Sequence, residues 1–265
     1  RIGPQRYYPH IHDFGFGEKT GVDLAGEVPG QVVFPTDKGW SPSNLVTNAF
    51  GQGIAVTPLQ LVAAASAVAN HGLMVKPRAV TAIRDSAGIH PIAPIEVRRV
   101  LPPDVAATLT HMLIDSAKIG EAQLAVVPGF NVAAKTGTAQ VASPKGGYAE
   151  GKFVASLLGF APADAPKFVM LVKIDEPQGV PFGAEVAAPV WRELAKQLFV
   201  HFRIEPTDPA ALARSAPKPT AVPTHKPAEA ELRPAASPRP RPAATKAPAK
   251  AAKPSIRATP AKAAR

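Results

Sequence analysis

Three segments of the chain repeat apolar residues with the period of a helix. The first covers residues 54–72, where Thr57 and Gln60 have the spacing of a Thr-x-x-Gln capping box. The body that follows is apolar nearly all round, which predicts a buried helix rather than a surface helix. Gly72 supplies the stop signal for this helix.

Two further helices are predicted over residues 104–118 and residues 186–202. Each has large apolar residues three or four positions apart, so one stripe of each helix should face the core. The stripe of the first helix consists of Val105, Leu109, Met112 and Leu113. The stripe of the second consists of Val190, Trp191, Leu194, Leu198 and Phe202. We expect the last helix to lie across a sheet.

Strand patterns occupy the region between these two helices. Runs of small, β-branched and aromatic residues cover residues 130–142, 152–160 and 167–174, and short Gly- and Pro-containing links join them. Consecutive strands with such short links pair antiparallel. The pattern therefore predicts an α+β fold, with an antiparallel β-sheet flanked by helices. Residues 1–50 are rich in Gly, Pro and Asp and predict a loop-rich segment with a few short elements.

The composition changes at Pro206, which divides the chain into residues 1–205 and a tail over residues 206–265. The tail holds 13 Pro, 19 Ala and no aromatic residue, with 12 Lys and Arg against 3 Asp and Glu. It cannot bury enough apolar surface to offset its ordering entropy, so we predict a disordered tail with polyproline II character.

The charge of the chain belongs mainly to this tail, which carries +9 of a net charge of +10. The basic balance therefore does not indicate a nucleic-acid-binding face on residues 1–205. The tail itself has the charge to attract acidic polymers or anionic lipid. The alternative is a solubilising segment with no fixed partner.

Other bulk features limit the chemistry. The chain has no Cys, which excludes a thiolate nucleophile, disulfides and a Cys-rich zinc site. It contains no run of about 18 apolar residues, the length that a membrane span needs. It begins at Arg1 rather than Met. We infer from this that it is the C-terminal part of a longer protein and that its fold is incomplete at the N-terminus.

The candidate chemistry lies in residues 131–140, Asn-Val-Ala-Ala-Lys-Thr-Gly-Thr-Ala-Gln. Alternation along a strand places its hydroxyl and amide side chains on one face, namely Thr136, Thr138 and Gln140. Lys135 and Gly137 then share the other face. A glycine inside a strand often marks the close approach of a ligand or another backbone. The stretch therefore predicts a binding edge for a carboxylate and a carbonyl; the alternative is an ordinary surface strand.

Several further stretches accompany this one in a fixed order. They are Phe14–Leu24, Phe50–Gln60, Ala69–Gly72, Ala134–Gln140, Leu158–Pro162, Ile174–Pro177 and Ala187–Val190. Together they resemble the C-terminal part of the transpeptidase domain of class B penicillin-binding proteins, over about residues 1–205. The Phe-Gly-Phe-Gly and Ile-Asp-Glu-Pro stretches are more similar to the septal, cell-division type than to the elongation type.

The resemblance implies a reaction. A serine attacks the peptide bond between the last two D-alanines of a peptidoglycan stem peptide, and the acyl group then passes to an amine of a neighbouring stem. β-Lactams trap the same serine, and neither a cofactor nor a metal is implied. The catalytic residues would be Lys135, which supplies positive charge, and Thr138, whose backbone N–H forms half of the oxyanion hole. The implied substrate-binding residues are Thr136, Gly137, Thr138, Gln140 and Gln52.

The family carries three sequence boxes, Ser-x-x-Lys, Ser-x-Asn and Lys-Thr-Gly, and residues 1–205 contain only the third. The first two are expected upstream of Arg1. Ser215 and Lys218 have the spacing of the first box, but they lie in the predicted disordered tail. The resemblance further implies cell-division proteins as partners. It also implies a place in the bacterial cell membrane through an upstream anchor, with the domain on the extracytoplasmic (periplasmic) side.

Two alternatives share the same fold. One is a non-catalytic penicillin sensor or scaffold domain, which keeps the Lys-Thr-Gly strand without turnover. The other is a serine β-lactamase, which has the same box. The matching stretches outside the box favour the penicillin-binding protein over the β-lactamase.

Overall fold

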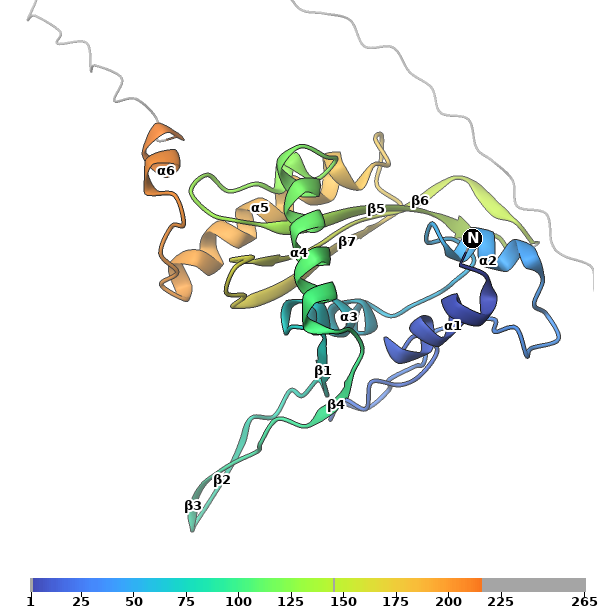
Figure 1. Cartoon of the computed structure of the whole chain (residues 1–265), viewed down its shortest axis with the longest axis horizontal. Coiled ribbons are helices and arrows are strands. Elements are labelled where there is room, and N and C mark those ends of the chain that lie inside the picture. Colours follow the sequence, from blue (N-terminus) through green and yellow to red (C-terminus); the bar gives the residue numbers. More distant parts are fainter. Residues whose placement is uncertain (1, 145, 216–265) are drawn as a thin grey trace, which may run out of the picture. The chain divides into compact units, whose positions relative to one another are not determined.

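The computed structural model describes residues 2–144 and 146–215 (Figure 1). The chain divides into two units, Arg1–Lys218 and Pro219–Arg265, and the described residues all belong to the first. Its elements in order are α1 (Pro4–Asp13), α2 (Pro42–Asn48), α3 (Pro58–Ala69), β1 (Leu73–Val75), β2 (Ala82–Asp85), β3 (Gly88–Pro91), β4 (Glu96–Arg99), α4 (Pro103–Lys118), the short 3₁₀ helix η1 (Gln123–Ala125), β5 (Ala133–Ala142), β6 (Tyr148–Ala161), β7 (Phe168–Asp175), α5 (Gly183–His201) and α6 (Pro209–Ser215).

The central sheet has the strand order β5-β6-β7, and both pairings are antiparallel. The three strands predicted from the sequence are therefore confirmed, and so is the α+β fold. In the register of the first pair, Gly137 lies opposite Ser156 and Thr138 lies opposite Ala155. β6 is the middle strand, and β5 and β7 are its neighbours on either side.

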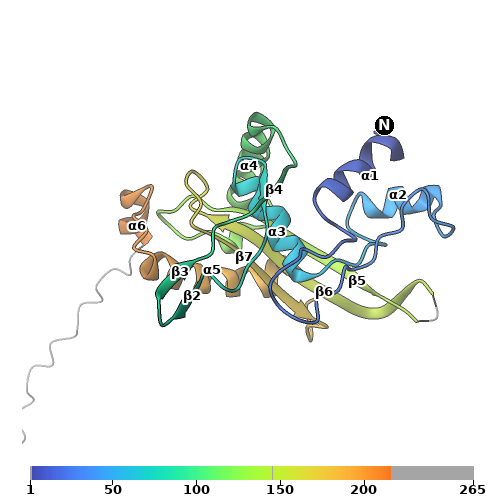
Figure 2. The ribbon, with the colours of Figure 1, turned by 90° about the horizontal axis from the view of Figure 1, so that it is seen from below.

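Helices cover both faces of this sheet (Figures 1 and 2). α5 packs on one face, while α3 and α4 pack on the other. Alternation along the strands separates the two cores, because neighbouring residues point to opposite faces. Ala134 and Leu157 join the cluster around Trp191 of α5, whereas Ala133 and Phe160 join the cluster of α3 and α4.

The buried faces of α4 and α5 differ from the predicted stripes. On α4, Leu109 and Leu113 pack against the core as predicted, whereas Val105 and Met112 are exposed. The buried positions of α4 are Ala106, Ile114 and Ala117. On α5, only Trp191 of the expected stripe is buried. The buried residues of α5 are Gly183, Ala187, Ala188, Trp191, Ala195 and Phe199. The prediction is wrong for the exposed large residues because small residues let both helices approach the sheet closely.

α3 has the predicted ends. The Gln60 N–H donates to the Thr57 hydroxyl (3.1 Å), and the Thr57 N–H donates to the Gln60 side-chain oxygen (2.8 Å), which closes the capping box. Gly72 has a φ of 84° just beyond the helix. Burial along the helix, with Gln60 only 1% exposed, confirms a buried element.

The N-terminal region, residues 2–57, contains more helix than the sequence predicted. α1 runs through Pro9, a residue that usually ends a helix, which is why the pattern did not reveal it. Tyr8 of α1 is buried and packs against Phe34 and Trp40. The Trp40 indole N–H donates to the Tyr8 hydroxyl (2.9 Å).

Two small antiparallel pairs join α3 to α4. β1 pairs with β4, and β2 pairs with β3 around a turn in which the Asp85 carboxylate accepts from the Ala87 N–H (2.8 Å). Every residue of β2 and β3 is exposed, and the hairpin extends away from β1 and β4 (Figure 1).

The start of the predicted tail is ordered. α6 begins after Asp208, whose N–H donates to the Gly129 carbonyl (3.0 Å) and whose carboxylate accepts from the Ala211 N–H (3.0 Å). The prediction of disorder from residue 206 is therefore wrong for α6. A capping Asp and a contact with the Gly129 loop fix this helix. The remainder of the tail, with Lys218, lies outside the described residues.

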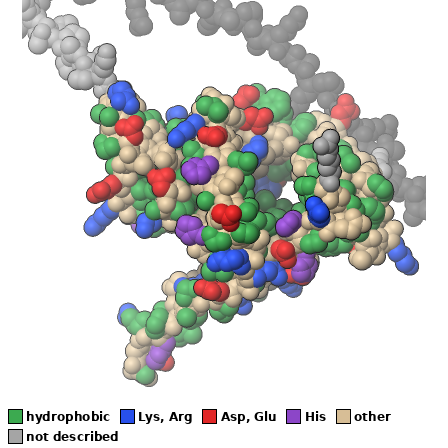
Figure 3. Space-filling model, in the orientation of Figure 1, with side chains coloured by type: hydrophobic (Ala, Val, Ile, Leu, Met, Phe, Trp, Pro, Cys, Tyr) green, Lys and Arg blue, Asp and Glu red, His purple; other side chains and the backbone are tan. Residues whose placement is uncertain are grey.

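The described surface mixes both signs of charge. On the face seen in Figure 3, Lys and Arg side chains alternate with Asp and Glu side chains, without a large area of one sign. This agrees with a nearly neutral balance over residues 1–205.

Candidate active site

The candidate stretch forms β5, at one side of the three-stranded sheet. Lys135 donates from its ammonium to the Thr136 carbonyl (3.1 Å), which therefore points away from β6. Backbone groups alternate in direction along a strand, so the N–H and C=O of Thr138 face the same way. A Cβ built on Gly183 would lie 2.5 Å from the Gly137 oxygen and 3.1 Å from the Ser156 nitrogen, which agrees with Gly137 facing β6. Within residues 2–144 and 146–215 no strand pairs with the outer edge of β5, and this free edge presents the backbone of Thr136 and Thr138.

A charged cluster spans this edge. The Thr136 hydroxyl donates to a carboxylate oxygen of Glu121 (3.0 Å), and the Lys135 ammonium lies 3.6 Å from the same oxygen. Lys135 also donates to the Thr136 hydroxyl (3.3 Å), so its side chain reaches around the edge from the opposite face of the strand. The hydrogen bond from Thr136 and the charge of Lys135 lower the pKa of the Glu121 carboxyl below its ordinary value.

Thr138 connects β5 to the start of α5. Its hydroxyl accepts a hydrogen bond from the Gly183 N–H (3.1 Å), one of the amide groups that a helix N-terminus leaves unpaired. Gly183 lies so close to the sheet that an added Cβ would be 2.3 Å from the Ser156 carbonyl oxygen. Glycine is therefore required where α5 meets the strand pair.

Gly137 has a neighbour that the sequence did not reveal. A Cβ at this position would lie 2.6 Å from the Ser156 hydroxyl, across the strand pair. The sequence predicted that the missing side chain leaves room for a ligand. On this face of the sheet the room is filled by Ser156 instead, because the two residues are directly opposite in the register.

The structure brings five of the six predicted site residues together on one strand: Lys135, Thr136, Gly137, Thr138 and Gln140. Gln140 is exposed, next to a register shift between Gln140 and Ala142. Gln52 lies apart from them, in the turn after α2, where its N–H donates to the Thr47 carbonyl (3.0 Å). Its side chain is not part of the bonded group that Glu121, Lys135 and Thr136 form.

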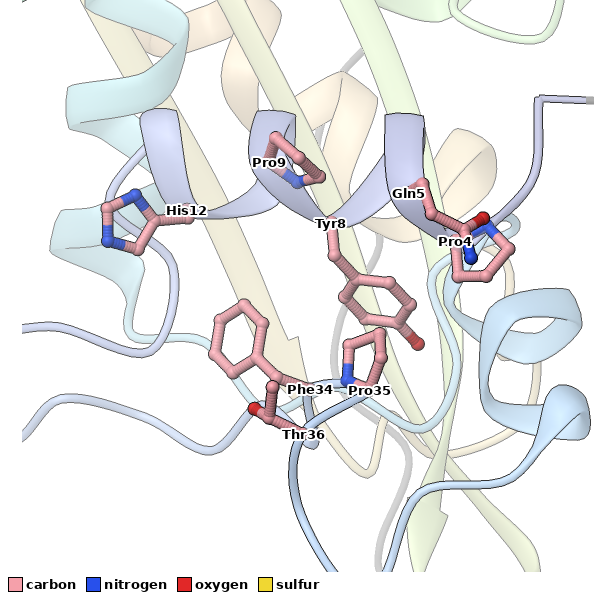
Figure 4. Close-up of a pocket in the computed structure, with 8 residues that line it drawn as sticks. All are labelled: Pro4, Gln5, Tyr8, Pro9, His12, Phe34, Pro35 and Thr36. Atoms are coloured by element: carbon pink, nitrogen blue, oxygen red, sulfur yellow. The ribbon is translucent and has the colours of Figure 1, made fainter.

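The described residues line cavities at two separate places. One of about 260 Å³ lies beside Lys135 and is almost entirely apolar, with walls from the sheet, α3, α4 and Phe14. Another, of about 450 Å³, lies between α1 and residues 34–36, where the Tyr8 side chain points toward Phe34 and Pro35 (Figure 4). The second cavity is larger but contains no residue of β5, so the chemistry points to the first.

A cation, two hydroxyls and a free strand edge beside an apolar cavity are the features expected for binding a peptide with a terminal carboxylate. Comparison with known proteins identifies the family. The family model for the penicillin binding protein transpeptidase domain matches residues 1–196. The chain belongs to the penicillin-binding protein transpeptidase family.

Relatives and solved structures of this transpeptidase family agree. The chain is 36% identical over 210 residues to stage V sporulation protein D of Bacillus subtilis, covering 78% of this chain and 32% of the relative. It is 33% identical over 195 residues to peptidoglycan D,D-transpeptidase FtsI of Escherichia coli, covering 73% of this chain and 31% of that protein. A crystal structure of penicillin binding protein 3 from Mycobacterium tuberculosis with ampicillin matches 79% of this chain and 48% of its own, with 33% identity and a TM-score of 0.70.

The chain spans about a third of the length of the curated relatives it matches. Sequence reasoning found the strand but missed Glu121, Ser156 and Gly183, which contact it. Glu121 is 15 residues before Thr136 in a segment without periodicity, so no local pattern indicates their contact. The pairing of Gly137 with Ser156 follows only once the strand register is known.

Proposed function

We propose that this chain is the distal part of a serine-type D-Ala-D-Ala transpeptidase that crosslinks peptidoglycan stem peptides and is acylated by β-lactams. The observation that carries the proposal is the Lys-Thr-Gly strand, with its ammonium and two hydroxyls along a free edge, in a chain of the penicillin-binding transpeptidase family. A relative named peptidoglycan D,D-transpeptidase and a structural neighbour with ampicillin support it.

In this proposal the substrate strand pairs with the free edge of β5, a form of β-augmentation. Lys135 supplies positive charge, and Thr136 and Thr138 bind the terminal carboxylate. The outward-facing N–H of Thr138 is one donor of the oxyanion hole, and losing one such donor typically costs about 10²–10³ in rate. Gly137 has no side chain, so this part of the strand stays narrow. Gln140 lies further along the same strand.

Gln52 lies apart from the other residues of the proposed site, because its turn belongs to the N-terminal region rather than to β5. Its half-buried position next to Asn48 supports a role in shaping the region. In the amide orientation that satisfies both ends of Asn48, its nitrogen donates to the Gln52 carbonyl (2.9 Å) and its oxygen accepts from the Tyr8 hydroxyl (3.2 Å).

The nucleophile of this reaction would come from sequence outside the chain, because residues 1–205 contain neither Ser-x-x-Lys nor Ser-x-Asn. We propose that the helix that carries the serine packs into the apolar cavity beside Lys135. Its walls include Leu61, Val68 and Leu109, which suit the apolar side of a helix. Lys135 at its border would then lie beside the attacking serine.

The location and partners are also proposals. The described residues contain no helix that is long and apolar enough to cross a membrane. We propose that an anchor outside this chain holds the protein at the bacterial membrane, with the transpeptidase domain on the extracytoplasmic side, where peptidoglycan lies. The similarity to FtsI supports a role in cell division and partners from the division machinery.

We propose the domain division at residue 205, shortly after the transpeptidase match ends at residue 196. Residues 1–205 would form the distal part of the transpeptidase domain, and the basic tail over residues 206–265 would contact acidic polymers or anionic lipid through its net charge of +9. α6 (Pro209–Ser215) forms the start of this second segment and packs against the Gly129 loop.

The test is acylation of the full-length protein by a fluorescent penicillin. We expect covalent labelling of the unsubstituted protein and loss of labelling in Lys135→Ala. Lys152→Ala is the matched control, because this lysine of β6 also forms an exposed ion pair, with Glu176 (2.9 Å), away from the site.

Absence of labelling in folded, unsubstituted protein would exclude the proposed function. Rapid release of the penicilloyl group would instead indicate a β-lactamase, and labelling without crosslinking of stem peptides would indicate a sensor or scaffold domain. Normal labelling of Lys135→Ala would show that the proposed site is wrong.

A further inference from the structure

Glu121 lies against groups that the proposed function assigns to the ligand carboxylate. One of its oxygens accepts from the Thr136 hydroxyl (3.0 Å) and lies 3.6 Å from the Lys135 ammonium. A carboxylate of the protein therefore already occupies part of the proposed carboxylate-binding position on β5.

The donors in this position are limited in number. A threonine hydroxyl has a single O–H, so Thr136 donates to one acceptor at a time. That proton is directed at Glu121, while Lys135 donates to the carbonyl and the hydroxyl of Thr136. A second carboxylate that binds Thr136 has to take over the hydrogen bond that Glu121 accepts.

The backbone around Glu121 is fixed. The Gly120 N–H donates to the Asp115 carbonyl (3.2 Å) and the Ala122 N–H donates to the Ser116 carbonyl (3.1 Å), both at the end of α4. Ala122 is fully buried, and a Cβ on Gly120 would lie 2.8 Å from the Ser116 oxygen. The loop therefore presents the Glu121 side chain from a defined position, although 77% of that side chain is exposed.

We propose that Glu121 is a specificity-determining residue of this site: its carboxylate competes with the carboxylate of the ligand for Thr136 and Lys135, so an anionic ligand has to displace it. The inference rests on the proposed function, which supplies the ligand. Because Glu121 is exposed, solvent screens the interaction, and displacement costs little. The residue therefore weakens the binding of anionic ligands without preventing it.

The experiment compares Glu121→Ala and Glu121→Gln in the full-length protein with two probes, a penicillin with a free carboxylate and the methyl ester of the same penicillin. We expect the second-order acylation rate constant for the carboxylate probe to rise about two- to five-fold in Glu121→Ala, the range for an exposed ion pair. Glu121→Gln removes the charge and keeps an acceptor, so its increase should be smaller. The ester should react with all three proteins at the same rate.

Salt provides a second readout. High ionic strength screens the contact between Glu121 and Lys135, so the difference between Glu121→Ala and the unsubstituted protein should shrink. Glu193→Ala is the matched control, because Glu193 forms an exposed ion pair with Lys196 (2.7 Å) on α5. This control should leave both rate constants unchanged, and thermal unfolding should be the same for all variants.

An unchanged rate for the carboxylate probe would overturn the inference, and so would an equal increase for the ester. A decrease in both variants would also overturn it, since Glu121 would then hold Lys135 and Thr136 in place for the ligand. These results differ from failure of the proposed function, in which the unsubstituted protein itself is not acylated.

Discussion

The layer formed by β5, β6 and α5 and the N-terminal region are stabilised in different ways. In the layer, small residues allow backbones to approach: Gly183 touches the strand pair, and Gly159 lies where Trp191 packs. In the N-terminal region, single polar side chains hold long loops. The buried Gln60 amide donates to the carbonyls of Gly15 (3.2 Å), Glu18 (2.7 Å) and Pro29 (2.8 Å).

This difference determines which substitutions each region tolerates. The layer has no room for an added methyl group at Gly137, Gly159 and Gly183. The N-terminal region has such room at Gly26 and Gly51, but it depends on the Gln60 donor, which satisfies partly buried carbonyls. The site lies on the first of these, where pairing with β6 and close packing against α5 together position β5.

The largest effect is expected for Gly183→Ala. Helix propensity alone favours alanine by about 1 kcal/mol, but the added methyl group would meet the backbone of Ser156 and Gly137 at 2.3 Å and 2.5 Å. We expect a loss of about 3 kcal/mol in the free energy of unfolding, measured with denaturant. Gly39→Ala is the control, because its methyl group would meet only Val33, at 3.9 Å. Equal stability of both variants would contradict close packing as the organising feature of the layer.

The second effect concerns Gln60→Leu, which keeps the volume and removes the amide. Three partly buried carbonyls and the Thr57 N–H lose a partner, so we expect a loss of about 2 kcal/mol in the free energy of unfolding. Hydrogen exchange should speed up in residues 15–30 and remain unchanged in β6. Gln123→Leu on the exposed η1 helix is the control. Uniform loss of protection across the sheet would show that the two regions are not separately stabilised.

A smaller effect is expected for Thr138→Val, which tests the hydrogen bond between Thr138 of β5 and Gly183 of α5. The Gly183 N–H loses its acceptor, and the free energy of unfolding should fall by about 1 kcal/mol. Penicillin labelling should fall more strongly, because the same hydroxyl is proposed to bind the ligand. Thr138→Ser should retain both stability and labelling. Parallel small losses in stability and labelling would argue against a role in binding.

The smallest effect is a pH dependence in the N-terminal region. The N–H groups of Ala79 and Val80 donate to the Asp23 carboxylate (2.6 Å and 2.9 Å) and lower its pKa below the ordinary value of 3.8. Because the folded-state pKa is lowered, the stabilisation is present above the unfolded-state pKa and is lost as the pH falls through the folded one. The amide proton shifts of Ala79 and Val80 should therefore titrate below pH 3.8, and Asp23→Asn should abolish the change. A midpoint above this value would contradict the contact.

The sequence predicted the elements whose signals are local. Thr57 and Gln60 are three residues apart, and the strand runs around β5, β6 and β7 need only their own composition. The prediction of which helix faces are buried was wrong in part, and the reason is physical. Alanine has little hydrophobic weight in a pattern, yet Ala187, Ala188 and Ala195 form the buried side of α5, while Val190 and Leu194 are exposed.

The site was predictable only in part. Lys135 to Thr138 could be recognised as a candidate strand, since their side chains and the family resemblance both indicated it. The contacts with Glu121, Ser156 and Gly183 depend on register and on packing between distant segments, which no local pattern reports. The wider role of Gln60 was missed for the same reason: its capping partner is near in sequence, whereas its three carbonyl partners are 31 to 45 positions away.

The free edge of β5 has a consequence for solubility. A row of outward-facing N–H and C=O groups accepts any extended chain, including the same strand of another molecule. Lys135 places a charge on this edge, and the register shift after Gln140 interrupts its regular course. Both features discourage edge-to-edge aggregation. Lys135, which is proposed to help bind a peptide, thus also reduces association between copies of the protein. Lys135→Ala should increase self-association, measured by light scattering.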